Sequence, residues 1–339
     1  MASDVTNSVC IVYASDDNFA EILGISIISL FENSRDMQEI VIYILDSGIS
    51  LGNKKKIEYI FRKYKRGIPK WIKAKNISEE ISMEVSADRG SLSQYARLFI
   101  SSLLPESIKK VLYLDCDILV LKSVKEIWNL DLHGNTVAAL MDAFSRYYRV
   151  NIGLNPEDVM FNSGVMLVDL EKWKKQKIEE KLLKFISQKN GNIQQGDQGA
   201  LNAVLSDDTY CFEPCFNSVS IYFDFSYDEL LVYRKPPVFY KRSQIKKAVE
   251  EPYIVHFTTS FISKRPWTEG CCHPYVGEWI NYKNISPWKN SPLWKDTRHK
   301  IYKTACFVAK HMPRKVMCCL FGILQAYIRP GINYIKNRF

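Results

Sequence analysis

The stretch Val9-Cys-Ile-Val-Tyr-Ala-Ser-Asp-Asp-Asn18 decides the fold class. Its first six residues form a β-branched apolar run, which predicts a buried strand, and its last four are polar, which predicts a loop. An apolar pattern at helical spacing follows over residues 19–31, and a second apolar run (39–45) and a basic amphipathic segment (53–64) repeat the order. This alternation favours an α/β domain with a mostly parallel central sheet, whose ligands bind at the carboxyl ends of the strands.

Further segments extend the same pattern. The runs at residues 110–114 and 161–168 predict two more buried strands, and the second of them contains Gly164, which indicates that another group approaches the backbone closely. Helices are expected at residues 91–104, 171–188 and 197–205. Neither a G-x-G-x-x-G nor a G-x-x-x-x-G-K-[ST] motif occurs, so the dinucleotide fingerprint and the P-loop lose their main support.

The charge of the chain is concentrated at its C-terminus. The 339 residues have a formal net charge of +9, but residues 298–339 hold nine Lys/Arg and no Asp/Glu. The rest of the chain therefore carries 37 basic and 37 acidic groups and is neutral. This arrangement indicates a neutral catalytic body that is followed by a basic tail.

The N-terminus and the cysteines indicate a cytoplasmic protein. The first eight residues contain no basic group and the apolar run at residues 9–14 is short, so we expect no signal peptide. Nine cysteines without a small-domain framework are interpreted as reduced thiols. One set of side chains could in principle form a metal site, although ordinary buried cysteines are commoner. The set consists of Cys211, Cys215, Cys271 and His273.

Two carboxylates stand where a buried strand ends. Asp115 and Asp117 point the same way from an extended chain, and Cys116 points to the other side. Two adjacent acids with apolar flanks are costly to bury unless a cation neutralises them. The pair therefore predicts a metal site, and the alternative is a strand-ending cap beside a solvated neighbour.

Six ordered motifs resemble those of the family 8 retaining glycosyltransferases, the bacterial lipopolysaccharide galactosyl- and glucosyltransferases above all. The resemblance covers about residues 8–270 and rests on the following segments: Ala14-Ser-Asp-Asp-Asn18, Tyr95-Ala-Arg97, Val111-Leu-Tyr-Leu-Asp-Cys-Asp117, Phe161-Asn-Ser-Gly164, Gly196-Asp-Gln198, and His256-Phe257 with Lys264-Arg-Pro-Trp267.

The resemblance implies a GT-A fold and a hexosyltransferase. The catalytic domain would span residues 1–284, with a nucleotide-binding half at about 8–120 and an acceptor-binding half at about 121–284. Residues 285–339 would form a basic, aromatic-rich helical tail. The enzyme would move galactose or glucose from a UDP-hexose to a lipopolysaccharide, capsular or other cell-surface glycan. The rival hypotheses are a UDP-sugar-binding protein without transfer activity and a membrane-associated scaffold.

The metal ligands come from the same resemblance. Asp115, Asp117 and His256 would bind Mn²⁺, with Mg²⁺ as the second choice, and the cation would also hold the UDP diphosphate. Two hard oxygen donors and one imidazole suit Mn²⁺ better than Ca²⁺. The alternative for His256 is a buried histidine at a strand end.

Further substrate-binding residues are implied along the nucleotide. Asp16 would contact uracil and Asn18 the ribose, within the loop that starts at Ala14, while Asp17 is a candidate N-cap. Cys116 belongs to the same binding segment. Arg97 would lie near the donor sugar and diphosphate, where a guanidinium offers several donors, and its alternative is a helix-surface salt bridge.

One motif departs from the family pattern. Residues 258–263 separate the His-Phe pair from Lys264 without a glycine. The resemblance assigns a phosphate contact to Lys264, and Arg265 is therefore a second candidate for the same contact.

The residues around the transferred sugar are implied as Asn162, Asp197, Gln198 and Asp142. Because Gln198 is a poor nucleophile, we favour front-face displacement with retention of configuration. Asp197 as a transient nucleophile is the competing mechanism.

The C-terminal tail predicts a membrane association. It interleaves Lys/Arg with aromatic and apolar residues, and its uncharged run at 316–328 is shorter than the roughly 20 residues of a membrane span. We therefore expect the tail to lie on an anionic membrane, with the enzyme peripheral on the inner face of the cytoplasmic membrane and a lipid-linked acceptor. The alternative is a helix that packs on the body. No nucleic-acid-binding motif is found, so nucleic acid is not expected as a partner.

Overall fold

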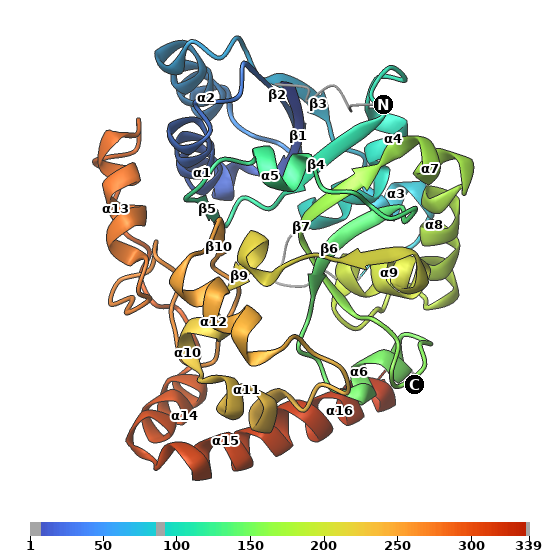
Figure 1. The fold of residues 1–339 in the computed structure, drawn as a ribbon, viewed down its shortest axis with the longest axis vertical. Coiled ribbons are helices and arrows are strands. Elements are labelled where there is room, and N and C mark those ends of the chain that lie inside the picture. Colours follow the sequence, from blue (N-terminus) through green and yellow to red (C-terminus); the bar gives the residue numbers. More distant parts are fainter. Residues whose placement is uncertain (1–7, 86–91, 337–339) are drawn as a thin grey trace.

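The computed structural model describes residues 8–85 and 92–336. A seven-stranded sheet forms the centre and is flanked by helices, a three-stranded sheet lies below it, and the C-terminal helices run along one end (Figure 1). The α/β class, the mostly parallel sheet and the helical C-terminus are thereby confirmed.

The large sheet has the strand order β3-β2-β1-β4-β7-β6-β8. Strand β7 is antiparallel to both of its neighbours, and the other pairs are parallel. The four predicted strands are all present. The bounds are β1 Ser8–Ser15, β2 Glu39–Asp46, β3 Lys70–Lys73, β4 Lys110–Leu114, β6 Val137–Met141, β7 Phe161–Asp169 and β8 Thr209–Cys211.

Two hydrophobic cores lie on the two faces of this sheet. Successive residues of a strand point to opposite faces, so Ile11 packs into one core and Val12 into the other. The first core contains α1 (Ala20–Asn33) and α2 (Leu51–Tyr64), which match the predicted helices. The second core contains the helices between residues 93 and 205 except α5 (Lys125–Trp128), whose Ile127 and Trp128 pack into the first core.

Two predicted helices differ in the structure. Residues 93–99 form the 3₁₀ helix η3 and only Ile100–Leu103 (α4) are α-helical, while Ser91 lies outside the described residues. The segment 171–188 is broken at Lys177, whose φ is +55°, into α7 (Leu170–Lys175) and α8 (Ile178–Gln188). A charged amphipathic pattern does not reveal such a break, because both halves keep the same buried stripe. Helix α9, Gly196–Leu205, was expected.

A second sheet, with the order β5-β10-β9, is absent from the sequence-based prediction. Its strands are only two or three residues long: β5 Ile118–Val120, β9 Ser218–Val219 and β10 Ile254–His256. Residues 115–117 are the direct link from β4 in the large sheet to β5 in the small one. The other helices of the body are α3 Ile77–Glu80, α5 Lys125–Trp128, α6 Arg146–Asn151, α10 Ile221–Asp224, α11 Tyr227–Arg234, α12 Arg242–Glu250 and α13 Val276–Ile285.

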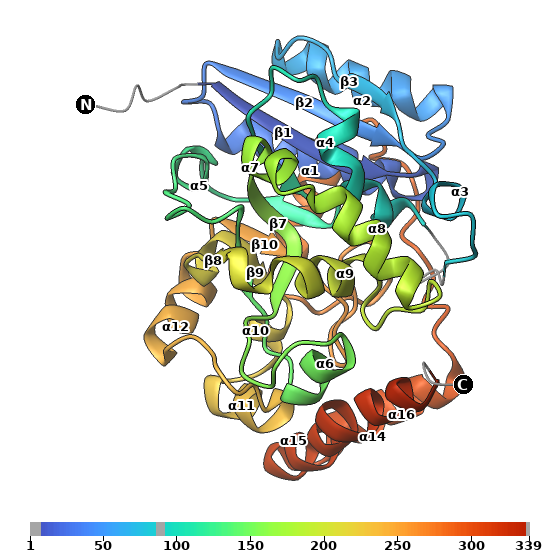
Figure 2. The same ribbon diagram turned by 90° about the vertical axis from the view of Figure 1, so that its right-hand side faces the viewer.

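The C-terminal helices begin at Lys300. Before them, Trp288 is buried against Gly24 of α1, and Trp294 pairs with Thr268, so residues 286–296 pack on the body. Helix α14 is followed by a nearly continuous helix along the lower end of the molecule (Figures 1 and 2). Helix α14 spans Lys300–His311. The helix that follows it consists of α15 Arg314–Ile323, a π-helical turn Leu324–Ile328 and α16 Arg329–Lys336.

The last helix is longer than the uncharged run suggested. Residues 314–335 form one helix that is long and apolar enough to cross a membrane by length and composition alone, and 28% of its most apolar window is buried against the body. One face of this helix is packed and the opposite one is exposed.

Candidate metal centre and adjoining cavities

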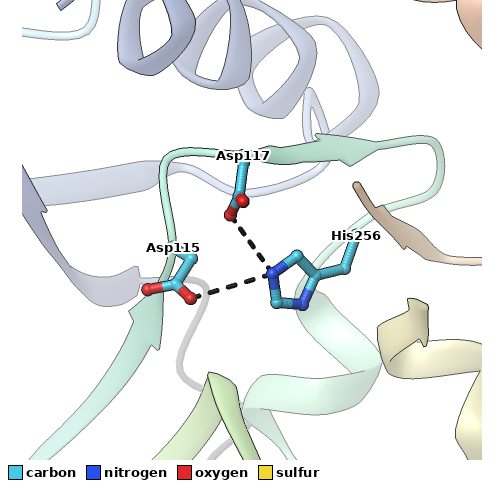
Figure 3. A group of neighbouring side chains, drawn as sticks. All are labelled: Asp115, Asp117 and His256. Carbon is cyan, nitrogen blue, oxygen red and sulfur yellow. Dashed lines mark ion pairs between the residues drawn. The ribbon is translucent and has the colours of Figure 1, made fainter. Parts of the chain in front are cut away.

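Three predicted metal ligands meet at the junction of the two sheets. Asp115 and Asp117 follow β4, and His256 ends β10 (Figure 3). His256 pairs with Ile118 across the antiparallel β5–β10 ladder, which places its side chain beside both carboxylates. The imidazole Nε2 lies 3.2 Å from Asp117 Oδ1 and 3.7 Å from Asp115 Oδ2.

The orientation of the His256 ring is set by two buried amides. The backbone N–H of Gly164 donates to Asn162 Oδ1, which also accepts from Asn217 Nδ2. Asn217 is therefore oriented with its Oδ1 toward His256 Nδ1, at 3.0 Å. Because a carbonyl oxygen can only accept, Nδ1 carries the proton and the Nε2 lone pair faces the two aspartates.

This donor set fits a divalent cation. One imidazole lone pair and two carboxylate oxygens converge, and their ligand atoms lie within 4.8 Å of one another. Such a set is mutually repulsive unless a positive group stands between the atoms. Gly164 provides the space that these side chains occupy, because a Cβ at this position would lie 2.1 Å from His256 Cε1 and 2.8 Å from Asp115 Oδ2. The predicted close approach at Gly164 is thus made by these two side chains.

Arg97 is buried beside this group and links three elements. Its guanidinium lies 2.7 Å from Asp115 and 2.9 Å from Asp197, and it donates to the backbone oxygen of Ser163 at 2.8 Å. The guanidinium also stacks over the Tyr113 ring. The alternative prediction, that Arg97 forms a salt bridge on a helix surface, is therefore wrong, because only 6% of the residue is exposed.

A cavity on the β1 side of the metal group contains several of the predicted nucleotide contacts. It is lined by Ala14, Asp16, Arg97, Asp115, Cys116 and Asp117, together with Phe19 and Ser93. Asn18 is exposed and does not line the described cavities. The N-cap role falls to Asp16, which accepts from Phe19 N, whereas Asp17 accepts from Ser50 N and Asn53 Nδ2 across the loop.

The two basic candidates for the phosphates point in different directions. Arg265 lines this cavity and its guanidinium lies 3.1 Å from Asp117 Oδ2. Lys264 donates to the carbonyl of Glu269 and pairs with Asp296 at 3.3 Å. The structure therefore brings Arg265, and not Lys264, to the described cavities.

A central cavity holds the residues predicted around the sugar. Asn162, Asp197 and Gln198 line it together with the metal group. Gln198 Oε1 accepts from Ser163 N and from Asn162 Nδ2, both at 3.3 Å. Burial raises the pKa of Asp197 to about 6, although Arg97 acts in the opposite direction.

A third cavity continues from Gln198 and Asn162 toward the C-terminal helices. Asp142 lines it, and burial raises the pKa of this carboxyl while Arg234 lowers it. The outer wall is formed by Tyr302, Gln325 and Arg329 of the tail. The sequence does not predict that the tail reaches the site, because no local pattern indicates that the tail turns back to the body.

The possible cysteine and histidine metal site is not formed. Within residues 8–85 and 92–336, the group at Asp115 is the one cluster of three such side chains close enough to hold a metal ion. All nine cysteines are free in this part of the chain. His273 instead packs against aromatic rings and accepts from Tyr275 N.

Comparisons with known proteins agree with this geometry. The model of the family described as Glycosyl transferase family 8 matches residues 10–271. General stress protein A of Bacillus subtilis (strain 168) is 33% identical over 282 residues, which cover 82% of this chain and 94% of that protein. Lipopolysaccharide 1,2-glucosyltransferase of Escherichia coli (strain K12) is 23% identical, with 85% and 82% covered.

Among solved structures, a galactosyltransferase, LgtC, in complex with donor and acceptor sugar analogs superposes with a TM-score of 0.67. The identity is 24%, and the match covers 87% of this chain and 99% of that one. At this identity the likeness concerns the fold.

Proposed function

The chain belongs to glycosyl transferase family 8 and has the GT-A fold, and from this we propose that it transfers galactose or glucose from UDP to a saccharide acceptor with retention of configuration. The acceptor class that we propose is a lipopolysaccharide, a capsule or another cell-surface glycan. The names of two similar proteins, a lipopolysaccharide glucosyltransferase and a galactosyltransferase, support this choice.

One observation carries the proposal. The lone pair of His256 and the carboxylates of Asp115 and Asp117 converge where the cavity on the β1 side meets the central one. Mn²⁺ is our first choice for this mixed oxygen and nitrogen set, and Mg²⁺ is the second. When bound, such a cation would neutralise the diphosphate leaving group.

Different residues of the chain are proposed to contact different parts of the donor. In our proposal Asp16 faces the uracil end, and Arg265 takes the phosphate contact that the family resemblance gave to Lys264. Arg97 holds Asp115 and Asp197 in place through its two ion pairs. Asn162 and Gln198 then stand at the sugar, on the side where the third cavity begins.

Retention is proposed to proceed by front-face displacement. Gln198 is an amide and cannot supply a carboxylate nucleophile. Asp197 is 5% exposed and ion-paired with Arg97, which opposes attack on the anomeric carbon. The acceptor hydroxyl would therefore approach from the third cavity, on the face that the diphosphate leaves, with its proton passing to the leaving oxygen.

We also propose that the enzyme works as a peripheral protein on the inner face of the cytoplasmic membrane. The support is the tail, whose helices hold exposed apolar residues beside basic ones. The most exposed include Ile301, Phe307, Val316, Leu320, Ile323, Ile328, Ile332 and Ile335.

A donor panel tests the proposed activity. UDP release from UDP-galactose and UDP-glucose is measured with Mn²⁺, Mg²⁺ or EDTA, and product configuration is read by NMR. We expect Mn²⁺-dependent hydrolysis, an α product, and a turnover at least roughly 100-fold lower in Asp117→Asn, as for the loss of leaving-group stabilisation.

The same panel separates the rival hypotheses. UDP-sugar binding without turnover would identify a binding protein, and the absence of both would favour a scaffold. Full activity in EDTA, or an inverted product, contradicts the proposal.

A further inference from the structure

The third cavity is built by two parts of the chain that are far apart in sequence. Its inner wall is formed by Asp142, Asn162 and Gln198 of the body, and its outer wall by Tyr302, Gln325 and Arg329 of the tail. The inner wall is shared with the central cavity, so a molecule in the third cavity would reach the sugar end of the proposed donor. The tail thus contributes directly to the place from which an acceptor would approach.

Two arginines give this cavity a positive wall. Arg234 ends α11 and Arg329 begins α16, and both line the cavity. Among the described residues, neither guanidinium forms a salt bridge with a carboxylate, and Arg234 Nε is buried without a hydrogen-bond partner. Arg234 instead stacks over the rings of Phe144 and Tyr233.

The charges nearby do not cancel this wall. Asp142 is the one acidic side chain among the residues that line the cavity, against two arginines. Burial raises the pKa of the Tyr148 phenol, and both Arg329 and Arg234 lower it. Because both arginines line this one cavity, each on a different helix, a single group bound there faces both cations.

The position of Arg329 is fixed by the contacts of the tail. Pro330 has no N–H, so the carbonyl of Ala326 lacks its usual helical donor. Ser145 Oγ donates to that carbonyl at 2.7 Å, and Tyr148 Oη donates to the carbonyl of Gln325 at 3.1 Å. The π-helical turn is thus fastened to α6 immediately before Arg329.

A second contact fastens the helix one turn earlier. Gly322 lies against α11, where a Cβ would stand 2.8 Å from the carbonyl oxygen of Val232. Arg314 pairs with Glu229 of the same helix at 2.8 Å. Helices α6 and α11 therefore hold the tail on both sides of the cavity, and its arginine is a built part of the wall.

We propose that this cavity binds a phosphate group carried by the acceptor, and that Arg234 of the body and Arg329 of the tail recognise it together. A phosphate offers three oxygens, which suits guanidiniums that approach from two helices. The inference rests on the proposed transfer function, because it assigns the cavity to the acceptor. It narrows the acceptor class to phosphorylated sugars, either soluble or linked to a lipid through a diphosphate.

The test measures binding to the full-length protein saturated with UDP and Mn²⁺, so that the proposed donor phosphate site is filled. The probes are glucose 1-phosphate against methyl glucoside, and decyl diphosphoglucose against decyl glucoside in detergent, with the matching galactose compounds. At least one phosphorylated probe should bind roughly tenfold more tightly than its neutral partner. A preference confined to the decyl diphosphate pair would assign the lipid-linked source.

Variants locate the effect. Arg329→Gln should lose most of the preference and Arg329→Lys should keep part of it, because lysine retains the charge without the planar fork. Lys315→Gln removes an exposed positive charge from the same helix outside the cavity, and should bind both kinds of probe as the wild type does. Arg329 lies on an exposed helix surface, so its variants remain informative if Arg234→Gln does not fold.

Two results overturn the inference. One is equal affinity for phosphorylated and neutral probes, including no detectable binding of either. The other is a preference that persists unchanged in Arg329→Gln. Failure of the wild type to bind UDP would instead contradict the proposed function, so the two failures are distinguishable.

Discussion

At the scale of single residues, the orientation of His256 depends on Asn217, which the sequence does not single out, and on Asn162, which it implies only as a sugar contact. Three hydrogen bonds in series connect the Gly164 N–H to the imidazole through Asn162 and Asn217 and thereby fix the orientation of both amides. Partners of this kind usually fix the tautomer of a metal-binding histidine. Asn217 is fully buried, which leaves it no contact with solvent and suits such a supporting role.

We therefore expect Asn217→Ala to weaken Mn²⁺ binding by about 10–100-fold, as removal of a supporting partner does. Electron paramagnetic resonance of free Mn²⁺ measures the affinity. Asn217→Asp is the matched control, since a carboxylate can still accept from Nδ1–H, and it should bind more tightly than the alanine variant. Wild-type affinity in Asn217→Ala would show that packing alone orients the ring.

A second residue prediction concerns His273, which is 1% exposed among aromatic rings. Burial lowers its pKa from 6.5 to about 4. Below pH 6.5 the unfolded chain therefore binds a proton that the folded chain does not, and stability is lost as the pH falls. From pH 7 to pH 5 this residue should cost about 2 kcal/mol of unfolding free energy.

Urea unfolding of the wild type and of His273→Phe at both pH values measures this effect. The variant should lose less stability between pH 7 and pH 5 than the wild type. It also loses the hydrogen bond from Tyr275 N, but that change is the same at both pH values. Equal acid sensitivity of the two proteins would contradict a neutral buried His273.

At the scale of elements, Gly164 in β7 is a requirement of the metal group. A methyl group at this position would overlap His256 and Asp115, and the hydrogen bond from Asp115 N to the Gly164 oxygen, at 2.7 Å, limits how far the strand can move away. Gly164→Ala should therefore fold but bind Mn²⁺ at least roughly tenfold more weakly.

Gly277→Ala is the control for this substitution. Its Cβ would meet nothing within 4 Å, and alanine is favoured in a helix such as α13. Thermal unfolding and Mn²⁺ titration of both variants would check the prediction. If Gly164→Ala binds Mn²⁺ normally, then the side chains can shift aside.

The elements also show what the sequence could predict. Strands β1, β2, β4 and β7 are buried apolar runs, and the periodicity located all of them. Strands β5, β9 and β10 have two or three residues, which is too short for any periodicity, and they pair segments distant in sequence. Asp115 and Asp117 were therefore predictable from a strand end, whereas the place of His256 needed the family resemblance.

The whole molecule combines a neutral body with a basic tail whose outer face is apolar. Exposed apolar residues recur at 316, 320, 323, 327 and 332, while Met317, Cys318, Gly322 and Ala326 face the body. The amphipathic tail is predictable from the sequence, but its place beside the site is not. Its attachment depends on contacts with α6 and α11 that no local pattern reveals.

We predict that the full-length protein floats with anionic liposomes and that salt weakens this binding without abolishing it. Two variants separate the contributions. Replacing the exposed Lys300, Lys310 and Lys315 by Gln should reduce binding at low salt, and replacing Leu320 and Ile323 by Gln should remove the salt-resistant part. If neither variant differs from the wild type in flotation, the tail is purely structural.

The metal group has one more consequence, because its ligands stand at the two ends of one long segment. Asp115 and Asp117 precede residues 118–255 in the chain, and His256 follows them. A cation shared by these three side chains would act as a reversible cross-link across that segment, comparable in topology to a disulfide. The enclosed segment contains Asp142, Asn162, Asp197 and Gln198. Loading the metal would thus make the segment that carries the proposed sugar contacts harder to unfold.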